Sequence, residues 1–169
     1  MYLDMKPIVS DGKTVMDFSL PMQESDCETL KELFPDVDFV YPIVVCGEVK
    51  NMSGYMVLYA EADVKFSAPC ARCAEPTESE LDLSLEKSIA TGDVSRENDD
   101  YIFMEDMKLD ISMPVFEELL LQMPSKILCR EDCRGLCARC GKNLNEGDCD
   151  CPKSEGDPRL AILKTLLEK

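Results

Sequence analysis

The sequence predicts an α+β protein: an antiparallel β-rich body, arranged as a meander or a partly closed barrel, with a few short helices and a small C-terminal metal-bound segment. Residues 7–20 and 39–91 are rich in Val, Tyr, Phe and Leu, with stretches of polar–apolar alternation typical of antiparallel strands. Apolar stripes with helical spacing lie outside these runs. Six of the ten cysteines fall within residues 129–151, a density that favours a metal site.

Two turn signals divide the predicted strands. The residues from Asn51 to Gly54 separate two β-rich runs, and the residues from Cys70 to Pro76 separate the next pair. Asn, Gly and Pro between strand-like runs favour β-hairpins because they accept the backbone angles of tight turns. Consecutive hairpins of this kind form a meander.

A short helix is predicted over residues 24–34. Ser25 or Asp26 can cap its first turn, and the helix ends before Pro35 because the residue before a proline disfavours the helical conformation. The next predicted element is a solvated acidic loop over residues 92–106, which begins with Gly and polar residues.

A second helix is predicted near residues 111–123, capped by Asp110 or Ser112 and stopped by Pro124. Its apolar positions recur near every fourth residue: Ile111, Val115, Phe116, Leu119, Leu120 and Met123. We expect this stripe to pack against the sheet, although the same stripe would suit a groove for a partner helix.

The chain is long enough for one compact core and a small appended module. We expect an acidic β-rich body over residues 1–125 and a cysteine-rich zinc segment over residues 126–156. A helix over residues 157–169 follows, with Asp157 as its N-cap and Pro158 at its first position, and it should dock on the body.

The formal net charge of −16 is unevenly distributed. Residues 126–169 hold nine basic and eight acidic side chains, so residues 1–125 carry −17. Bare RNA or DNA should be repelled by such a body, and a basic protein partner fits it better. No apolar run approaches the roughly 20 residues that span a bilayer, and the N-terminus lacks a signal-peptide pattern, so we expect a soluble, cytoplasmic protein with reduced thiols.

The strongest motif is Cys137-Ala-Arg-Cys140, whose spacing lets two thiolates reach one metal ion in a tight turn. Cys149 and Cys151 follow closely enough to complete a tetrahedral site. Upstream, Cys70-Ala-Arg-Cys73 and the pair Cys129 and Cys133 could make a second four-thiolate site.

The residues leave another grouping open, in which one zinc ion is held by Cys133, Cys137, Cys140 and either Cys149 or Cys151. We therefore expect one or two structural zinc ions. Cys27 and Cys46 have no partner at ligand spacing and are expected to be ordinary core or surface thiols.

Two other uses of these cysteines fit the sequence less well than zinc. Thiol redox chemistry generally uses a single Cys-x-x-Cys pair between a strand and a helix, and the ferredoxin spacing of iron–sulfur proteins is absent. Four basic side chains surround the thiolates and can either compensate their charge or touch phosphates: Arg130, Arg134, Arg139 and Lys142.

Nothing in the sequence indicates catalysis. The chain contains no histidine, which removes imidazole acid–base chemistry and every histidine-containing catalytic zinc site. Phosphate-binding glycine loops are also absent. We expect a protein that is not an enzyme and has no small-molecule substrate.

Several ordered motifs together resemble the bacterial YceD family. They are Asp110 to Pro124, Leu128-Cys129, Asp132-Cys133-Arg-Gly-Leu-Cys137-Ala-Arg-Cys140-Gly-Lys-Asn-Leu-Asn145, Asp157-Pro-Arg-Leu160, and the early pair Cys70 and Cys73. The resemblance covers roughly residues 37–169. Ala138 and Ile127 stand where the family often has proline.

The resemblance implies a cytoplasmic, non-enzymatic factor needed for accumulation of large-subunit ribosomal RNA. We therefore expect a factor for large ribosomal subunit biogenesis whose acidic body binds a ribosomal protein or assembly factor of that subunit. Contact with ribosomal RNA through the C-terminal segment is left open. The rival hypotheses are a zinc-ribbon-type nucleic-acid-binding module and, less favoured, a thiol redox or zinc switch.

Overall fold

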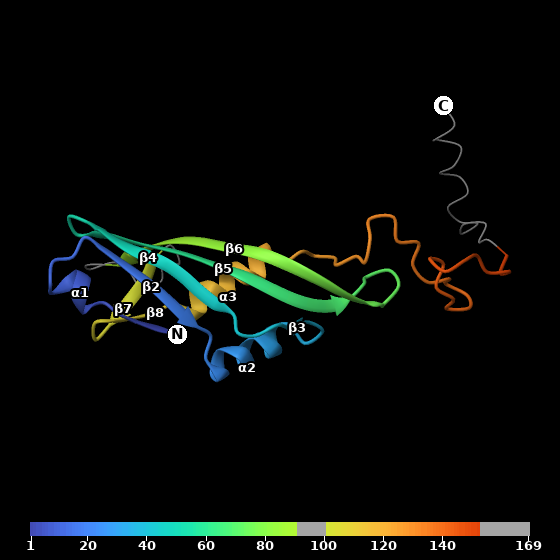
Figure 1. Cartoon of the computed structure of the whole chain (residues 1–169), viewed down its shortest axis with the longest axis horizontal. Helices are drawn as coiled ribbons and strands as arrows, with labels where there is room; N and C mark the ends of the chain where they lie inside the picture. The colour runs from blue at the N-terminus through green and yellow to red at the C-terminus, as the bar shows by residue number, and fades with distance from the viewer. Residues whose placement is uncertain (91–100, 153–169) are drawn as a thin grey trace, which may run out of the picture.

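The computed structural model describes residues 1–90 and 101–152 of the chain. The molecule is elongated, with a strand-rich body and a cysteine-rich segment that extends beyond one end of the longest hairpin (Figure 1). The described strands are β1 (Tyr2–Asp4), β2 (Val15–Pro21), β3 (Asp38–Phe39), β4 (Val44–Met52), β5 (Tyr55–Pro69), β6 (Pro76–Ala90), β7 (Tyr101–Glu105) and β8 (Lys108–Asp110). The described helices are α1 (Lys6–Val9), α2 (Glu24–Leu33) and α3 (Ser112–Gln122).

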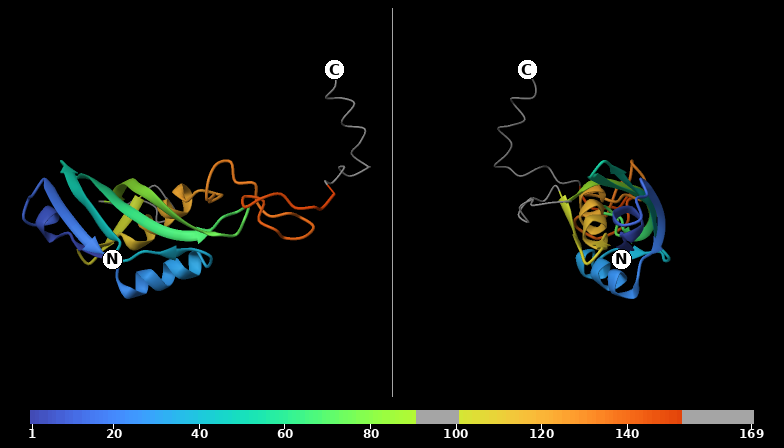
Figure 2. Two further views of the ribbon diagram at one scale, coloured as in Figure 1. Left: turned by 45° about the vertical axis from the view of Figure 1, so that its right-hand side comes forward. Right: turned by 90° about the vertical axis from the view of Figure 1, so that its left-hand side faces the viewer.

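The eight strands form one sheet in the order β1-β8-β7-β6-β5-β4-β2, with β3 pairing to β5. All neighbours are antiparallel except β6 and β7, which run parallel over Ser88–Ala90. Viewed along the long axis, the strands curve partly around α3 (Figure 2). The predicted α+β class with an antiparallel β-rich body is confirmed, with a single parallel pairing added.

Both predicted hairpins are present. β4 and β5 are joined by Ser53 and Gly54, whose φ angles of 58° and 99° are both positive. Two-residue hairpin turns favour such left-handed angles because their twist matches that of the strands. β5 and β6 are joined by residues 70–75, where the Cys70 N–H donates to the Glu75 carbonyl.

Alternation along β5 and β6 sends one face of the sheet into the core. Ala60, Ala62, Val64 and Phe66 of β5 are buried, and Leu83 and Leu85 of β6 lie on the same side. The intervening residues of β6 are exposed and mostly acidic. The carboxylates that make the chain acidic are therefore partly gathered on the outer face of this hairpin.

Helix α2 forms where the sequence predicts it, but its predicted cap is wrong. Gln23 is the N-cap, and its backbone N–H donates to Asp26 Oδ2 at 2.9 Å in a capping box. The other Asp26 carboxylate oxygen accepts a hydrogen bond from the Ser112 hydroxyl at 2.9 Å. Asp26 thus sits in the first turn, buried between α2 and α3, instead of preceding the helix.

Helix α3 also forms as predicted and packs its stripe against the sheet. Val115, Phe116 and Leu119 are buried, whereas Leu120 is 47% exposed, so Leu120 was wrongly assigned to the core. Its N-cap is Ile111. Of the two predicted caps, Asp110 lies one residue earlier and accepts the Ser112 N–H at 2.9 Å, and Ser112 lies inside the helix.

Two further predictions need correction. The strand predicted from residue 7 begins only at Val15, because Lys6–Val9 forms the single-turn helix α1 with Pro7 in its first turn. The predicted loop over residues 92–106 is wrong for Tyr101–Glu105, which is strand β7 held by long-range pairing to β6 and β8.

The predicted helix over residues 157–169 and most of the predicted acidic loop lie outside the described residues. Within the described ranges, every helix is too short or too polar to cross a lipid bilayer.

Candidate metal centres

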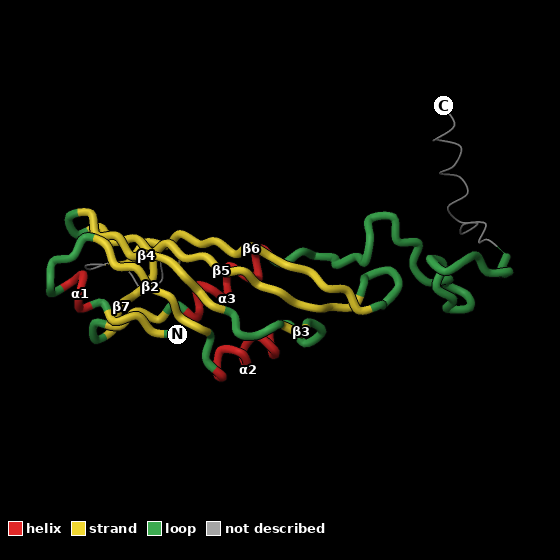
Figure 3. The backbone as a smooth tube through the Cα atoms, in the orientation of Figure 1, coloured by secondary structure: helices red, strands yellow, loops and turns green. Residues whose placement is uncertain are grey.

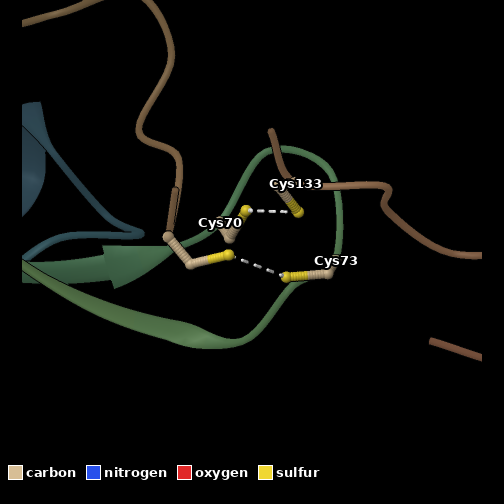
Figure 4. Close-up of side chains that lie close together, drawn as sticks. Cys70, Cys73 and Cys133 are labelled. Atoms are coloured by element: carbon tan, nitrogen blue, oxygen red, sulfur yellow. Dashed lines mark hydrogen bonds between the residues drawn. The ribbon is translucent and has the colours of Figure 1, made fainter. Parts of the chain in front are cut away.

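The first candidate centre joins two parts of the chain that are far apart in sequence. Cys70 and Cys73 lie in the turn between β5 and β6, and Cys129 and Cys133 lie in the segment after α3. The Cys70 and Cys133 sulfurs are 3.8 Å apart, and the Cys73 and Cys129 sulfurs are 3.6 Å apart (Figure 4). All four sulfurs lie within 4.8 Å of one another.

These distances fit a tetrahedral metal site. Four thiolates at about 2.3 Å from a central zinc ion would have sulfurs about 3.8 Å apart. The sulfurs are well beyond the roughly 2.0 Å of a disulfide bond, and all ten cysteines are free. Cys70, Cys73 and Cys133 are buried and pack with Leu128, whereas Cys129 is exposed, so three of the four sulfurs are shielded from solvent.

Backbone contacts hold the two halves of the first centre together. The Ala71 N–H donates to the Ile127 carbonyl at 2.8 Å. The Arg72 guanidinium donates from one nitrogen to the carbonyls of Glu131 and Cys133, at 3.1 and 2.8 Å. Arg72, which sits between the two cysteines of its motif, therefore holds the segment after α3 through two of its backbone carbonyls.

Hydrogen-bond donors stabilise two of the four thiolates at this centre, whereas desolvation of its thiol raises the pKa of Cys129 to about 12. The backbone N–H groups of Cys129 and Arg72 lower the pKa of Cys70 to about 6. The Asn145 side-chain amide, which donates to the Cys133 sulfur at 3.3 Å, lowers the pKa of Cys133. Such donors around the ligands are typical of metal–thiolate sites, because they balance the charge of the sulfurs.

The second candidate centre is local. Cys137, Cys140, Cys149 and Cys151 bring four sulfurs within 4.8 Å of one another. The Cys137 N–H donates to the Lys142 carbonyl, and the Gly141 N–H donates back to the Cys137 carbonyl, both at 2.9 Å. Backbone N–H groups of Cys140 and Arg139 lower the pKa of Cys137 to about 6.

A close backbone contact joins the segment between the two centres to the β5–β6 turn. Gly135 has a φ of +73°, and a Cβ atom there would lie 2.9 Å from the Arg72 carbonyl oxygen. This same carbonyl accepts the Leu136 N–H at 3.1 Å. Only glycine permits this approach and this angle together, so Gly135 lets the second centre dock on the β5–β6 turn.

Two asparagines that sequence reasoning did not assign a role connect the centres. Asn143 donates to the Glu75 carboxylate at 2.7 Å, and Asn145 accepts the Arg134 N–H at 2.7 Å while donating to Cys133. Their Asn-x-Asn spacing after a Cys-x-x-Cys motif is a signal that could have indicated them.

Most of the basic side chains near the thiolates serve the segment itself. Arg130 donates to the Asn145 side chain, Arg134 pairs with the Asp148 carboxylate, and Lys142 donates to the Asp148 carbonyl. Arg139 is exposed. Internal contacts thus occupy three of the four side chains that were considered for phosphate binding.

The structure separates the eight predicted ligands into two groups of four. Cys133 belongs with Cys70, Cys73 and Cys129, and not with Cys137 and Cys140 as in the alternative grouping. Cys27 and Cys46 belong to neither group, and Cys46 instead donates to the Ser19 hydroxyl at 3.3 Å.

Fold and sites define a class of protein: a curved β-rich body whose longest hairpin ends at a cysteine-rich segment, with two adjacent four-cysteine groups that can each hold a metal ion. The sequence model of the YceD family, described as "Large ribosomal RNA subunit accumulation protein YceD", matches residues 58–167. The chain belongs to this family.

The relatives of this chain include bacterial and plant proteins. The chain is 30% identical over 102 residues to an uncharacterized protein of Mycobacterium tuberculosis, covering 58% of this chain and 49% of the relative. It is 28% identical over 144 residues to the uncharacterized protein YlbN of Bacillus subtilis, covering 83% of each. It is 34% identical over 62 residues to the chloroplastic "Large ribosomal RNA subunit accumulation protein YCED homolog 1" of Arabidopsis thaliana, covering 37% of this chain and 19% of the relative.

The chain spans about half the length of the mycobacterial relatives that it matches. No solved structure matches it.

Proposed function

We propose that this protein is a non-enzymatic factor in biogenesis of the large ribosomal subunit, which supports accumulation of large-subunit ribosomal RNA in the cytoplasm by binding a protein partner. Family membership carries this proposal, since the match covers residues 58–167 and the family is described by that role. The plant relative of the same name supports it.

Zinc is the metal that suits both centres. Four thiolates complete a tetrahedral zinc shell and leave no open position for substrate or water, which is the arrangement of structural sites and not of catalytic ones. Between α3 and residue 152 the described chain has no helix or strand (Figure 3). Two metal centres would supply the stability that a segment with so little buried apolar surface lacks.

Charge favours a basic protein over RNA as the direct partner. The chain carries a net charge of −16, and carboxylates line the outer face of the β5–β6 hairpin. Bare phosphates would be repelled there. The basic side chains of the cysteine-rich segment are largely engaged in contacts within that segment. The partner we propose is a ribosomal protein or assembly factor of the large subunit.

The proposal is tested by deleting the gene in its native host and measuring large-subunit ribosomal RNA relative to small-subunit ribosomal RNA. We expect the ratio and the peak of mature large subunits in sucrose gradients to fall, and a plasmid copy of the intact chain to restore both. An unchanged ratio in the deletion strain would refute the proposed function.

A separate measurement tests the metal. Native mass spectrometry of the purified chain should show two zinc ions, and one after replacement of either Cys-x-x-Cys pair by serine. A control in which Cys27 and Cys46 are replaced should keep both ions. Metal-free protein with the same circular dichroism and proteolysis pattern as loaded protein would argue against a structural role.

A further inference from the structure

Strand β6 has a long edge with no neighbouring strand. On one side it pairs with β5 along its whole length, from Pro76 to Ile89. On the other side β7 pairs only with Ser88–Ala90, so that most of the long β6 edge in Figure 3 has no strand beside it. Within residues 1–90 and 101–152, no backbone hydrogen bond reaches Thr77–Lys87 from that side. Natural proteins usually shorten or cover such an edge, because its unpaired N–H and C=O groups can pair with another chain.

Two hydrogen bonds show which backbone groups face this edge. In an antiparallel pair, each residue directs both its N–H and its C=O to one side, and successive residues alternate. The Ser84 carbonyl accepts from the Gln122 side chain at 2.9 Å, which places it on the side away from β5. By alternation, the backbone groups of Asp82 and Glu80 point the same way.

Hydrogen bonds of the neighbouring strand β5 show independently which residues of β6 direct their backbone groups away from β5. The Lys65 carbonyl of β5 accepts the Val40 N–H at 2.8 Å, on the side away from β6. Lys65 lies directly opposite Glu80. This pair therefore exchanges no hydrogen bonds, and the Glu80 N–H and C=O face the open edge.

Side chains at the edge have one sign of charge. Glu78, Glu80 and Asp82 are exposed on the same face of β6. Asp82 lies directly opposite Asp63, a like-charge pair that costs stability in an isolated sheet. Lys65 is the one basic side chain opposite these three acidic residues.

This acidic charge pattern determines what kind of chain can pair with the β6 edge. A second copy of the chain would bring two acidic rows together, and an RNA strand would be repelled. A strand with Lys or Arg at every second residue would place its cations beside the carboxylates while its backbone completed the ladder. The edge ends at Ser84, where Gln122 already occupies the carbonyl.

We propose that the open edge of β6 from Thr77 to Leu83 binds an extended, Lys- and Arg-rich segment of a partner protein as an additional β-strand. This proposal rests on the proposed function, because it names how the basic partner is held.

The test uses the zinc-loaded full chain and a fluorescent twelve-residue peptide of alternating Lys and Thr. A second peptide of the same sequence is N-methylated at the residues whose N–H groups would pair with β6. It keeps the charge of the first peptide but cannot donate the backbone hydrogen bonds of an added strand. Glu80→Pro removes an N–H that the β5 ladder does not use, and proline is tolerated at such edge positions. Glu80→Gln keeps that N–H and removes the charge.

We expect Glu80→Pro to weaken binding of the first peptide roughly tenfold, because it removes an edge hydrogen bond and alters the backbone next to it. Glu80→Gln, which removes only the charge, should weaken binding roughly threefold. Glu28→Gln on α2 is the matched charge control and should change nothing, because Glu28 is exposed on a helix away from the edge. The N-methylated peptide should not bind measurably. In the wild type, hydrogen exchange should show new protection of the Glu78, Glu80 and Asp82 amides.

Equal binding of both peptides to the wild-type chain would overturn the strand-addition proposal. So would peptide-induced protection from hydrogen exchange at amides outside β6. Both measurements use the wild-type chain, so they do not depend on the folding of a variant. Self-association of the chain through β6 would overturn it as well. In the deletion strain, rescue of ribosomal RNA by a stable Glu80→Pro variant would overturn the edge proposal and leave the proposed function standing. Failure of the wild-type chain to restore ribosomal RNA in the deletion strain would instead refute the proposed function.

Discussion

Replacing one cysteine pair at each centre should have unequal effects on the stability of the body. Cys73 and Cys129 are 56 positions apart, and the strands and helix between them belong to the body. An unfolded chain would have to close that loop to hold the same zinc ion, at a cost of about 4 kcal/mol at 25 °C. By linkage, zinc at the first centre should favour the folded body by about the same amount, roughly a thousandfold in affinity.

The double variant Cys70→Ser and Cys73→Ser should therefore lose one zinc ion and about 4 kcal/mol of unfolding free energy, a large share of the 5–15 kcal/mol typical of a domain. The double variant Cys137→Ser and Cys140→Ser should also lose one ion, yet change the unfolding free energy of the body by less than about 0.5 kcal/mol. Its centre closes only a short loop outside the body.

The assay is urea unfolding followed by far-ultraviolet circular dichroism at fixed free zinc, with zinc content measured on the same samples. Equal destabilisation by the two double variants would refute the loop-closure reasoning. So would retention of two zinc ions by the first variant.

Three further outcomes are expected. Hydrogen bonds lower the pKa of Cys70 and Cys137 to about 6, so the stabilisation of these two thiolates is lost as the pH falls through about 6, whereas desolvation raises the pKa of Cys129 to about 12 and the Cys140 thiol raises the pKa of Cys151 to about 12. Because zinc needs all four thiolates of a centre and competes with protons for them, zinc content, followed with a colorimetric chelator, should fall as the pH is lowered, and a zinc content that is unchanged between about pH 8 and pH 4 would contradict this. Gly135→Ala should cost about 1–3 kcal/mol, since a Cβ would press on a backbone carbonyl of the β5–β6 turn at positive φ, and limited proteolysis should then cut the cysteine-rich segment faster. Leu119→Ala, at a fully buried position, should lower the urea unfolding free energy by about 2–5 kcal/mol, whereas Leu121→Ala, 78% exposed on the same helix, should stay within about 0.5 kcal/mol.

Local features of the chain could be predicted from sequence because short-range physics determines them. The turn at Ser53 and Gly54 needs two residues at positive φ, and the Asn51 to Gly54 run indicates it directly. Pro124 ends the helix before it wherever that helix packs. Cys-x-x-Cys spacing brings two sulfurs to one point in a tight turn whatever surrounds them. The fold class and the identity of the eight clustered cysteines follow from such signals.

Features that depend on distant partners could not be predicted this way. Strand β7 has the polar, acidic surroundings of a loop and is a strand because β6 and β8 pair with it. Asp26 is drawn into the first turn of α2 by its contact with Ser112 of α3, so a capping rule applied to the local sequence selected the wrong residue.

The sequence by itself determined the α+β class, the two hairpin turns of the long strands, the eight clustered cysteines and the acidity of the body. Tertiary structure alone decided that Cys70 and Cys73 meet Cys129 and Cys133, because only the folded β5–β6 hairpin brings positions more than fifty residues apart within bonding range of one ion. It also decided that the acidic edge of β6 stays unpaired among the described strands, since register and order in a sheet are properties of the whole set of strands.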